Sequence, residues 1–203
     1  PLPHLSDEKK QPAHYLVVPA GGTGLVLRGL RKEPATIGKW HLGWDLTYKE
    51  GKAKTVDNID FTKRVANGPT DRGFDYFYGL TSPSGPPHLY MVNDMAEKQP
   101  NTRFEESGGG LYKIKGGIGH SDWSADGMQP HLADKMLEYL DENKDSDKPF
   151  FLYMALTAPH IPLFPSKEFK GKSKIGDYGD LVMMIDDIVG RVNRKLKEIG
   201  KYD

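Results

Sequence analysis

The sequence predicts an α/β fold in which a mixed, mostly parallel sheet is flanked by helices. Residues 149–156 (Pro-Phe-Phe-Leu-Tyr-Met-Ala-Leu) are apolar on both faces, as a central parallel strand should be. Residues 35–37 form a shorter apolar run that stops at Gly38, where the backbone can turn sharply. From Tyr178 to Gly200, apolar residues recur at steps of three and four, which predicts a helix of about 20 residues with one apolar face.

The composition limits the class of protein. A chain of 203 residues suits one domain with a real core, or a large piece of a bigger one. Its 28 basic and 28 acidic residues give no net charge, so the composition does not indicate binding to nucleic acid or to an anionic membrane. Any anion site must therefore be local. The absence of cysteine excludes disulfides, thiolate metal ligands and a cysteine nucleophile. No apolar run approaches the length of a membrane span.

The first third of the chain is weakly patterned around its short apolar run. Residues 15–18 suit a strand, which Pro19 and a glycine run would end. Residues 25–32 suit two helical turns before Pro34. Residues 44–69 are polar, and their glycine, lysine and aspartate residues indicate a solvated loop or hairpin.

The middle of the chain combines a short strand with long loops. Aromatic residues between the glycines of residues 73–79 predict a strand that packs its aromatic side chains on one face. Residues 86–90 form a rigid loop in which His88 either faces a substrate or lies on the surface. Residues 93–128 are irregular and rich in glycine, and loops of this length are usually functional or mobile. Apolar residues at helical spacing then predict a helix over residues 129–143.

One lysine and two histidines follow the two expected buried strands. Lys39 and His41 come directly after the first, and His160 follows the second between two prolines. Open α/β sheets bind ligands at the carboxyl ends of their strands, so these side chains are expected to lie within about 10 Å of one another around an anion. The alternatives are a surface turn with a structural histidine at His41, and a rigid loop with an incidental histidine at His160.

The strings that carry these residues resemble the signatures of one family. Residues 38–43 (Gly-Lys-Trp-His-Leu-Gly) resemble the second signature of the sulfatases, the formylglycine-dependent sulfate-ester hydrolases. Residues 73–79 resemble a Gly-Phe-Asp-x-Phe-x-Gly segment of many sulfatases, and residues 158–162 (Ala-Pro-His-Ile-Pro) resemble the third signature. The resemblance covers residues 29–203 as an internal part of a sulfatase catalytic domain, and it leaves residues 1–28 as a poorly matching lead-in.

This resemblance implies a fold and a set of roles. The family fold is the alkaline-phosphatase-like α/β sandwich. Lys39 matches the lysine that binds a sulfate oxygen, His41 the histidine beside the formylglycine, and His160 the histidine that contacts sulfate or protonates the leaving oxygen. His88 is a further candidate for substrate binding. The implied partner is a small sulfate ester or a sulfated glycan, and the family metal is calcium. The compartment is unknown from the residues, and the family implies a periplasmic, secreted or lysosomal one.

The chain also departs from the family pattern. Residues 81–85 (Thr-Ser-Pro-Ser-Gly) superficially resemble the nucleophile motif, but threonine is a secondary alcohol that cannot yield an aldehyde, and the motif should precede Lys39. Neither the formylglycine precursor nor the paired aspartates and Asp-Asn-Gly ligands of the calcium site are found. The expectation is an internal fragment that holds sulfate-contacting residues and does not hydrolyse sulfate esters by itself.

Two other interpretations stay open. The first is a non-catalytic module that binds sulfate or sulfated glycans. The second keeps the superfamily but changes the chemistry to phosphate-ester cleavage, which the Lys-Trp-His pattern disfavours. A fragment of a larger sheet is also expected to expose apolar strand edges, which favour aggregation or pairing with another chain.

Overall fold

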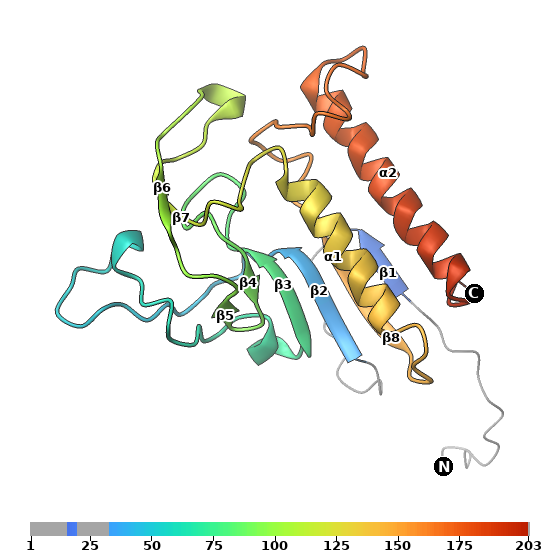
Figure 1. Cartoon of the computed structure of the whole chain (residues 1–203), viewed down its shortest axis with the longest axis horizontal. Helices are drawn as coiled ribbons and strands as arrows, with labels where there is room; N and C mark the ends of the chain where they lie inside the picture. Colours follow the sequence, from blue (N-terminus) through green and yellow to red (C-terminus); the bar gives the residue numbers. More distant parts are fainter. Residues whose placement is uncertain (1–15, 20–32, 203) are drawn as a thin grey trace, which may run out of the picture.

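The computed structural model describes residues 16–19 and 33–202, which form a six-stranded sheet, a two-stranded sheet and two α-helices (Figure 1). The pairs β1–β8, β8–β2 and β2–β3 are parallel, whereas β3–β4 and β4–β5 are antiparallel. The predicted mixed, mostly parallel sheet is therefore confirmed. In sheet order, the strands are β1 (Leu16–Pro19), β8 (Phe150–Ala155), β2 (Glu33–Lys39), β3 (Tyr76–Leu80), β4 (Met91–Val92) and β5 (Met95–Ala96).

The strand β8 is a central strand, as its sequence predicts. It lies between β1 and β2 and is parallel to both. Leu152 and Met154 are buried on the side of the helices, while Phe151 and Tyr153 pack into a second apolar cluster on the other side. Apolar side chains on both faces are what a strand covered from both sides requires.

Two helices cover one face of the sheet. They are α1 (Met128–Glu142) and α2 (Asp177–Glu198), close to the predicted bounds of both, and they enclose the main core (Figure 1). Each large apolar side chain buried there stabilises the fold by roughly 1.5–3 kcal/mol. Ion pairs of Asp134 with Arg191 (2.6 Å) and of Asp141 with Lys195 (3.2 Å) show that the helices run in the same direction. Neither helix of the described chain is long and apolar enough to cross a membrane.

The second face of the sheet is covered by loops. Bridges between Asp45 and Ala66 and between Tyr48 and Ile59 confirm a hairpin-like loop within residues 44–69. This loop is less solvated than predicted, because several of its apolar side chains are buried. The buried residues of this loop-covered cluster are Trp40, Ile59, Phe61, Val65, Phe74, Phe77, Leu89 and Met91.

Three other predictions need correction or lie outside the described residues. The aromatic side chains of β3 do not share one face, because Tyr76 and Tyr78 face the helices and Phe77 faces the loops. Residues 93–128 are less irregular than predicted, since they contain β5 and a two-stranded sheet. The two helical turns expected over residues 25–32 lie outside the described residues. The remaining short elements are β6 (Thr102–Phe104), β7 (Gly117–Gly119), η1 (Val56–Asn58), η2 (Thr70–Arg72) and η3 (Gly110–Tyr112).

Candidate functional site

The carboxyl ends of β2 and β8 lie side by side because these strands are parallel neighbours. Gly38 is the register partner of Ala155, so the loops after Lys39 and after Leu156 leave the sheet next to each other. Gly38 has a φ of 133°, and a Cβ at this position would overlap the carbonyl oxygen of Ala155. Only glycine allows this approach of two backbones. We call this region the carboxyl edge, and it is the candidate site.

Lys39 is the last residue of β2, rather than the first residue of a loop. It is partly buried, and desolvation lowers the pKa of its ammonium group. The part of the chain that the structure describes forms no ion pair with it. A partly desolvated cation without a carboxylate partner favours an anion as its ligand.

The turn after Lys39 is fixed by two tryptophans. The backbone N–H of Trp40 donates to the carbonyl of Leu80 (3.1 Å), and its buried indole N–H donates to the carbonyl of Gly43 (3.1 Å). The indole N–H of Trp44 in turn donates to the Trp40 carbonyl (3.2 Å). These bonds hold the turn while His41 stays exposed to solvent.

His160 is exposed on the loop that follows β8. Its backbone N–H donates to the carbonyl of Thr157 (3.1 Å), and its Nδ1 lies 2.6 Å from the carbonyl oxygen of Ile161. A carbonyl only accepts, so Nδ1 carries a proton and donates it. The other ring nitrogen, Nε2, then remains available to accept a proton from a ligand or to donate one.

A buried amide that the sequence analysis missed holds this loop. Gln129, in the first turn of α1, is only 2% exposed. Its side-chain oxygen accepts hydrogen bonds from the backbone N–H groups of Ala158 (2.8 Å) and Thr157 (3.3 Å), and from the hydroxyl group of Thr157. Gln129 thus ties α1 to the loop two residues before His160. A polar residue on the apolar face of the predicted helix was the only signal that could have indicated it.

The structure corrects both interpretations of His88. The side chain is 1% exposed, so it neither lies on the surface nor faces a substrate. Its ring packs against Trp123 (4.4 Å between centroids) and Phe104 (5.1 Å), and its Nε2 donates to the carbonyl of Lys115 (2.7 Å). Burial lowers the pKa of His88, and its Nδ1 has no hydrogen-bond partner in the described structure. His88 therefore packs the two-stranded sheet as a neutral side chain.

The described residues do not fit the calcium site that the resemblance implies. Within residues 16–19 and 33–202, no three histidine or carboxylate side chains gather as a metal-binding group. Calcium binding needs six or more oxygen ligands. The side chains that the carboxyl edge offers to an anion include Lys39, His41 and His160.

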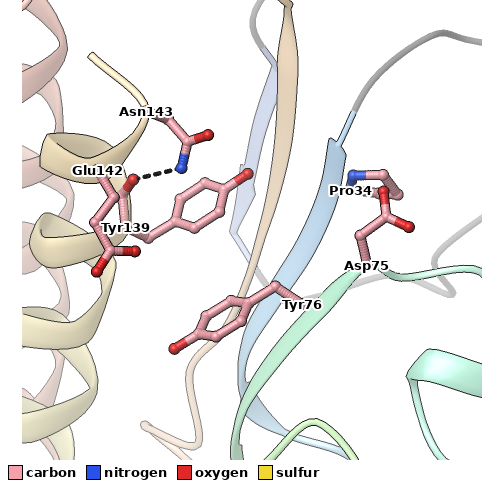
Figure 2. A pocket seen from close by; sticks show the side chains of 6 residues that line it. All are labelled: Pro34, Asp75, Tyr76, Tyr139, Glu142 and Asn143. Carbon is pink, nitrogen blue, oxygen red and sulfur yellow. Dashed lines mark hydrogen bonds between the residues drawn. The ribbon is translucent and has the colours of Figure 1, made fainter. Parts of the chain in front are cut away.

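A pocket of about 340 Å³ lies at the opposite end of the sheet (Figure 2). Asp75 and Glu142 contribute carboxylates to its lining, and the rings of Tyr76 and Tyr139 stack at 5.9 Å between centroids. Pro34, at the start of β2, also lines it, which sets the pocket at the amino ends of the strands. We call this region the amino edge. Its acidic lining makes it unsuited to sulfate.

The structure brings three of the four predicted site residues to one edge of the sheet. Lys39 and His41 follow β2, and His160 follows the neighbouring strand β8. Their expected approach to within about 10 Å stays a prediction. His88 belongs to the two-stranded sheet instead.

Comparison with known proteins gives one family. The family model "Sulfatase" matches residues 26–203. The pig N-acetylgalactosamine-6-sulfatase is 30% identical over 178 residues, which are 86% of this chain and 29% of that protein. The N-acetylgalactosamine-6-O-sulfatase of Bacteroides thetaiotaomicron is 25% identical over 199 residues, covering 82% of this chain and 37% of that protein. The chain thus spans well under half the length of these curated relatives.

Solved structures show the same fold. A Bacteroides thetaiotaomicron structure described with the metabolism of multiple glycosaminoglycans has a TM-score of 0.64 at 21% identity, covering 84% of this chain and 40% of that one. The PsFucS1 sulfatase from Pseudoalteromonas sp. has a TM-score of 0.56 at 22% identity, covering 84% and 33%. The expected alkaline-phosphatase-like α/β fold is confirmed.

Proposed function

The chain belongs to the sulfatase family, and we propose that its carboxyl edge is the sulfate-binding part of a sulfuric ester hydrolase site. The observation that supports this most is the parallel pairing of β2 with β8, which brings the end of β2, at Lys39, beside the loop that carries His160. The matching position of these residues in the family signatures supports it independently. The relatives named above suggest a 6-sulfated amino sugar as the substrate class.

Each side chain has a role that its surroundings allow. Lys39 binds a sulfate oxygen, and because its ammonium group is partly desolvated, the attraction is stronger than on an open surface. In its imidazolium form, with a proton on each ring nitrogen, His160 donates the Nε2 proton to the oxygen that leaves the sulfur, while the carbonyl of Ile161 holds its Nδ1–H. His41, exposed beside Lys39, contributes a second imidazole to the same edge.

The chain by itself is proposed to bind sulfate without turnover. Covalent transfer of a sulfuryl group needs a nucleophile, and this sequence has no cysteine, and no serine within the family's nucleophile motif, from which formylglycine could form. The second candidate function, a non-catalytic module that binds sulfate or sulfated glycans, rests on this same observation and on the lack of a metal-binding group among the described residues.

Calorimetric titration with inorganic sulfate at low ionic strength tests the binding proposal. Binding is expected to weaken by about tenfold or more in Lys39→Ala, because the variant loses the attraction between the lysine ammonium group and the charge of the sulfate. Lys54→Ala, which removes an exposed lysine from the nearby loop, is the matched control and should bind as the parent does. Equal affinity in the parent and Lys39→Ala would overturn the site.

An aryl-sulfate assay with added calcium tests the lack of turnover. Turnover that disappears in Lys39→Ala and His160→Ala would overturn that part of the proposal. Sedimentation of the chain separates the two candidate functions. A stable monomer would favour the self-contained module, and self-association through sheet edges would favour a part of a larger hydrolase domain.

A further inference from the structure

A second pocket, of about 380 Å³, lies among the loops that follow β8 and precede the two helices. We call it the loop pocket. Its volume is in the range of small-molecule sites. Ala125, Leu163 and Pro165 give it an apolar part, and aromatic rings, ammonium groups and carboxylates make up the rest of the lining. The aromatic and charged residues are Tyr112, Phe164, Lys167, Lys170, Asp126 and Asp177.

The loop pocket lies at the same end of the sheet as the carboxyl edge. Phe164 follows His160 by four residues along the loop after β8. Asp177 is the first residue of α2, and α2 runs in the same direction as α1, whose first turn holds the His160 loop through Gln129. The backbone N–H of Leu163 donates to the carbonyl of Leu111 (2.8 Å), which joins η3 to this loop.

One wall of the pocket is aromatic and partly open. The ring of Tyr112 meets Phe164 edge to face at 6.0 Å between centroids, and Tyr112 is 40% exposed. A hydrogen bond to Asp177 raises the pKa of the Tyr112 hydroxyl and orients the ring. An aromatic face that is held in place and reachable from solvent suits the apolar face of a flat ligand.

The charged groups of the pocket are balanced. Lys167 and Lys170 are exposed and have no ion-pair partner within the described ranges. Two carboxylates, Asp126 and Asp177, line the same space. The neighbouring Lys172 lies over the ring of Phe169 (5.1 Å) and does not line the pocket. Two ammonium groups that donate and two carboxylates that accept match a ligand that carries both acceptors and donors, such as a ring of hydroxyl groups, better than they match a simple anion.

We propose that the loop pocket binds the sugar unit that adjoins the sulfated unit of a saccharide chain. This inference rests on the proposed function, because it takes the sulfated unit to lie at Lys39 and His160. The neighbouring sugar packs its apolar face against Tyr112 while its hydroxyl groups donate to the carboxylates and accept from the lysines. Selection for a saccharide over a small sulfate ester would then arise outside the sulfate-binding residues.

Calorimetry with three probes tests this. The probes are inorganic sulfate, N-acetylgalactosamine 6-sulfate, and a disaccharide that joins the same sulfated unit to an uncharged hexose. The disaccharide is expected to bind on the order of tenfold more tightly than the monosaccharide, as one aromatic contact and a few hydrogen bonds allow. This ratio should fall to about one in Tyr112→Ala and in the double variant Lys167→Ala/Lys170→Ala, with the binding of inorganic sulfate unchanged.

Two control variants separate this inference from the proposed function. Lys174→Ala removes an exposed lysine of the same segment that does not line the pocket, so it should keep the ratio. Lys39→Ala should weaken all three probes and also keep the ratio. Equal affinity for the two saccharides, or a ratio that survives the pocket variants, overturns the inference. Sulfate binding that ignores Lys39 overturns the proposed function instead.

Discussion

The carboxyl and amino edges are built from the same strands and from opposite ends of the same helix, yet their side chains differ in charge and in anchoring. At the carboxyl edge, Lys39 ends β2 before a turn that indole hydrogen bonds hold, and His160 lies on a loop that backbone hydrogen bonds hold. At the amino edge, Asp75 and Glu142 surround stacked tyrosines. The 28 basic and 28 acidic residues cancel in the sum, yet the lining of the amino edge holds Asp75 and Glu142 and no lysine or arginine. A neutral chain can therefore present a local anion site.

The largest expected effect comes from adding a Cβ atom where the backbones of β2 and β8 approach each other at the carboxyl edge. Gly38→Ala places a Cβ against the Ala155 carbonyl and also strains a backbone with a φ of 133°. We expect a loss of unfolding free energy on the order of 4 kcal/mol, or failure to fold, because neither backbone can move away.

Gly43→Ala is the matched control for this loss. Its φ is 100°, but a Cβ there meets no atom within 4 Å, so only the backbone strain of about 1 kcal/mol is expected. Urea unfolding of both variants gives the comparison. Similar losses would mean that the close approach of β2 and β8 does not limit this edge.

The next effect concerns how α1 holds the two edges. Gln129→Leu removes the acceptor for the backbone N–H of Ala158, and it leaves that donor without its partner. We expect a loss of about 2 kcal/mol in unfolding free energy, together with shifted imidazole resonances of His160. At the other end of the helix, the side-chain amide of Asn143 donates to the carbonyl of Tyr139 in its own last turn (2.8 Å).

Asn143→Ala is therefore expected to cost less than about 1 kcal/mol and to leave the His160 resonances in place. Chemical denaturation and histidine NMR spectra measure both quantities in each variant. If Gln129→Leu leaves His160 unchanged, α1 packs against the loop without positioning it.

This difference in anchoring marks where prediction from sequence succeeded and where it could not. The strands β1, β2, β3 and β8 and both helices followed from period and apolarity. Burial of β8 on both faces, for example, leaves a continuous apolar run in the sequence. Lys39 and His160 could be placed at strand ends for the same reason. The contact between Gln129 and Ala158 joins residues 29 positions apart, and it depends on the direction of α1, which no local pattern encodes.

His88 shows the same limit. The pattern around it, prolines followed by aromatic residues, suits a surface loop as well as a buried one. Its burial depends on Trp123 and Phe104 arriving from the two-stranded sheet and its neighbouring loop. Those short strands are only three residues long, too short to give a periodic signal.

A smaller effect comes from two histidines that lie outside the linings of both edges, and it concerns the response of the fold to acid. Burial lowers the pKa values of His88 and of His131, whose Nε2 lies 2.6 Å from the hydroxyl oxygen of Tyr78. Below the ordinary histidine pKa of about 6.5, the unfolded chain binds these protons and the folded chain does not. The contribution of these two histidines to the unfolding free energy is therefore complete above about pH 6.5. It decreases as the pH falls below that value, by up to about 1.4 kcal/mol per pH unit for each histidine.

His88→Gln should flatten this dependence by about one proton, whatever its effect on stability at neutral pH. The measurement is unfolding by urea at several values between pH 5 and pH 7.5, compared as slopes. A slope that is unchanged in His88→Gln would assign the acid sensitivity to carboxylates instead.

The smallest expected effect tests the negative charge of the amino edge directly. Desolvation, followed by the charges of Glu142, Glu138 and Glu97, raises the pKa of the Tyr76 hydroxyl to about 12. A carboxylate opposes formation of the tyrosinate, so Glu142→Gln should lower the pKa of Tyr76. The change is expected to be a few tenths of a unit, because desolvation is the larger cause and remains.

Tyrosinate absorbance of the folded variant, with Tyr76→Phe subtracted to isolate this ring, measures the pKa of Tyr76. Glu168→Gln, an exposed carboxylate outside the pocket lining, should leave the pKa in place. If Glu142→Gln also leaves the pKa of Tyr76 unchanged, the carboxylates of the amino edge do not affect the ionisation of this tyrosine. Desolvation alone would then account for the shifted pKa values of both Tyr76 and Lys39.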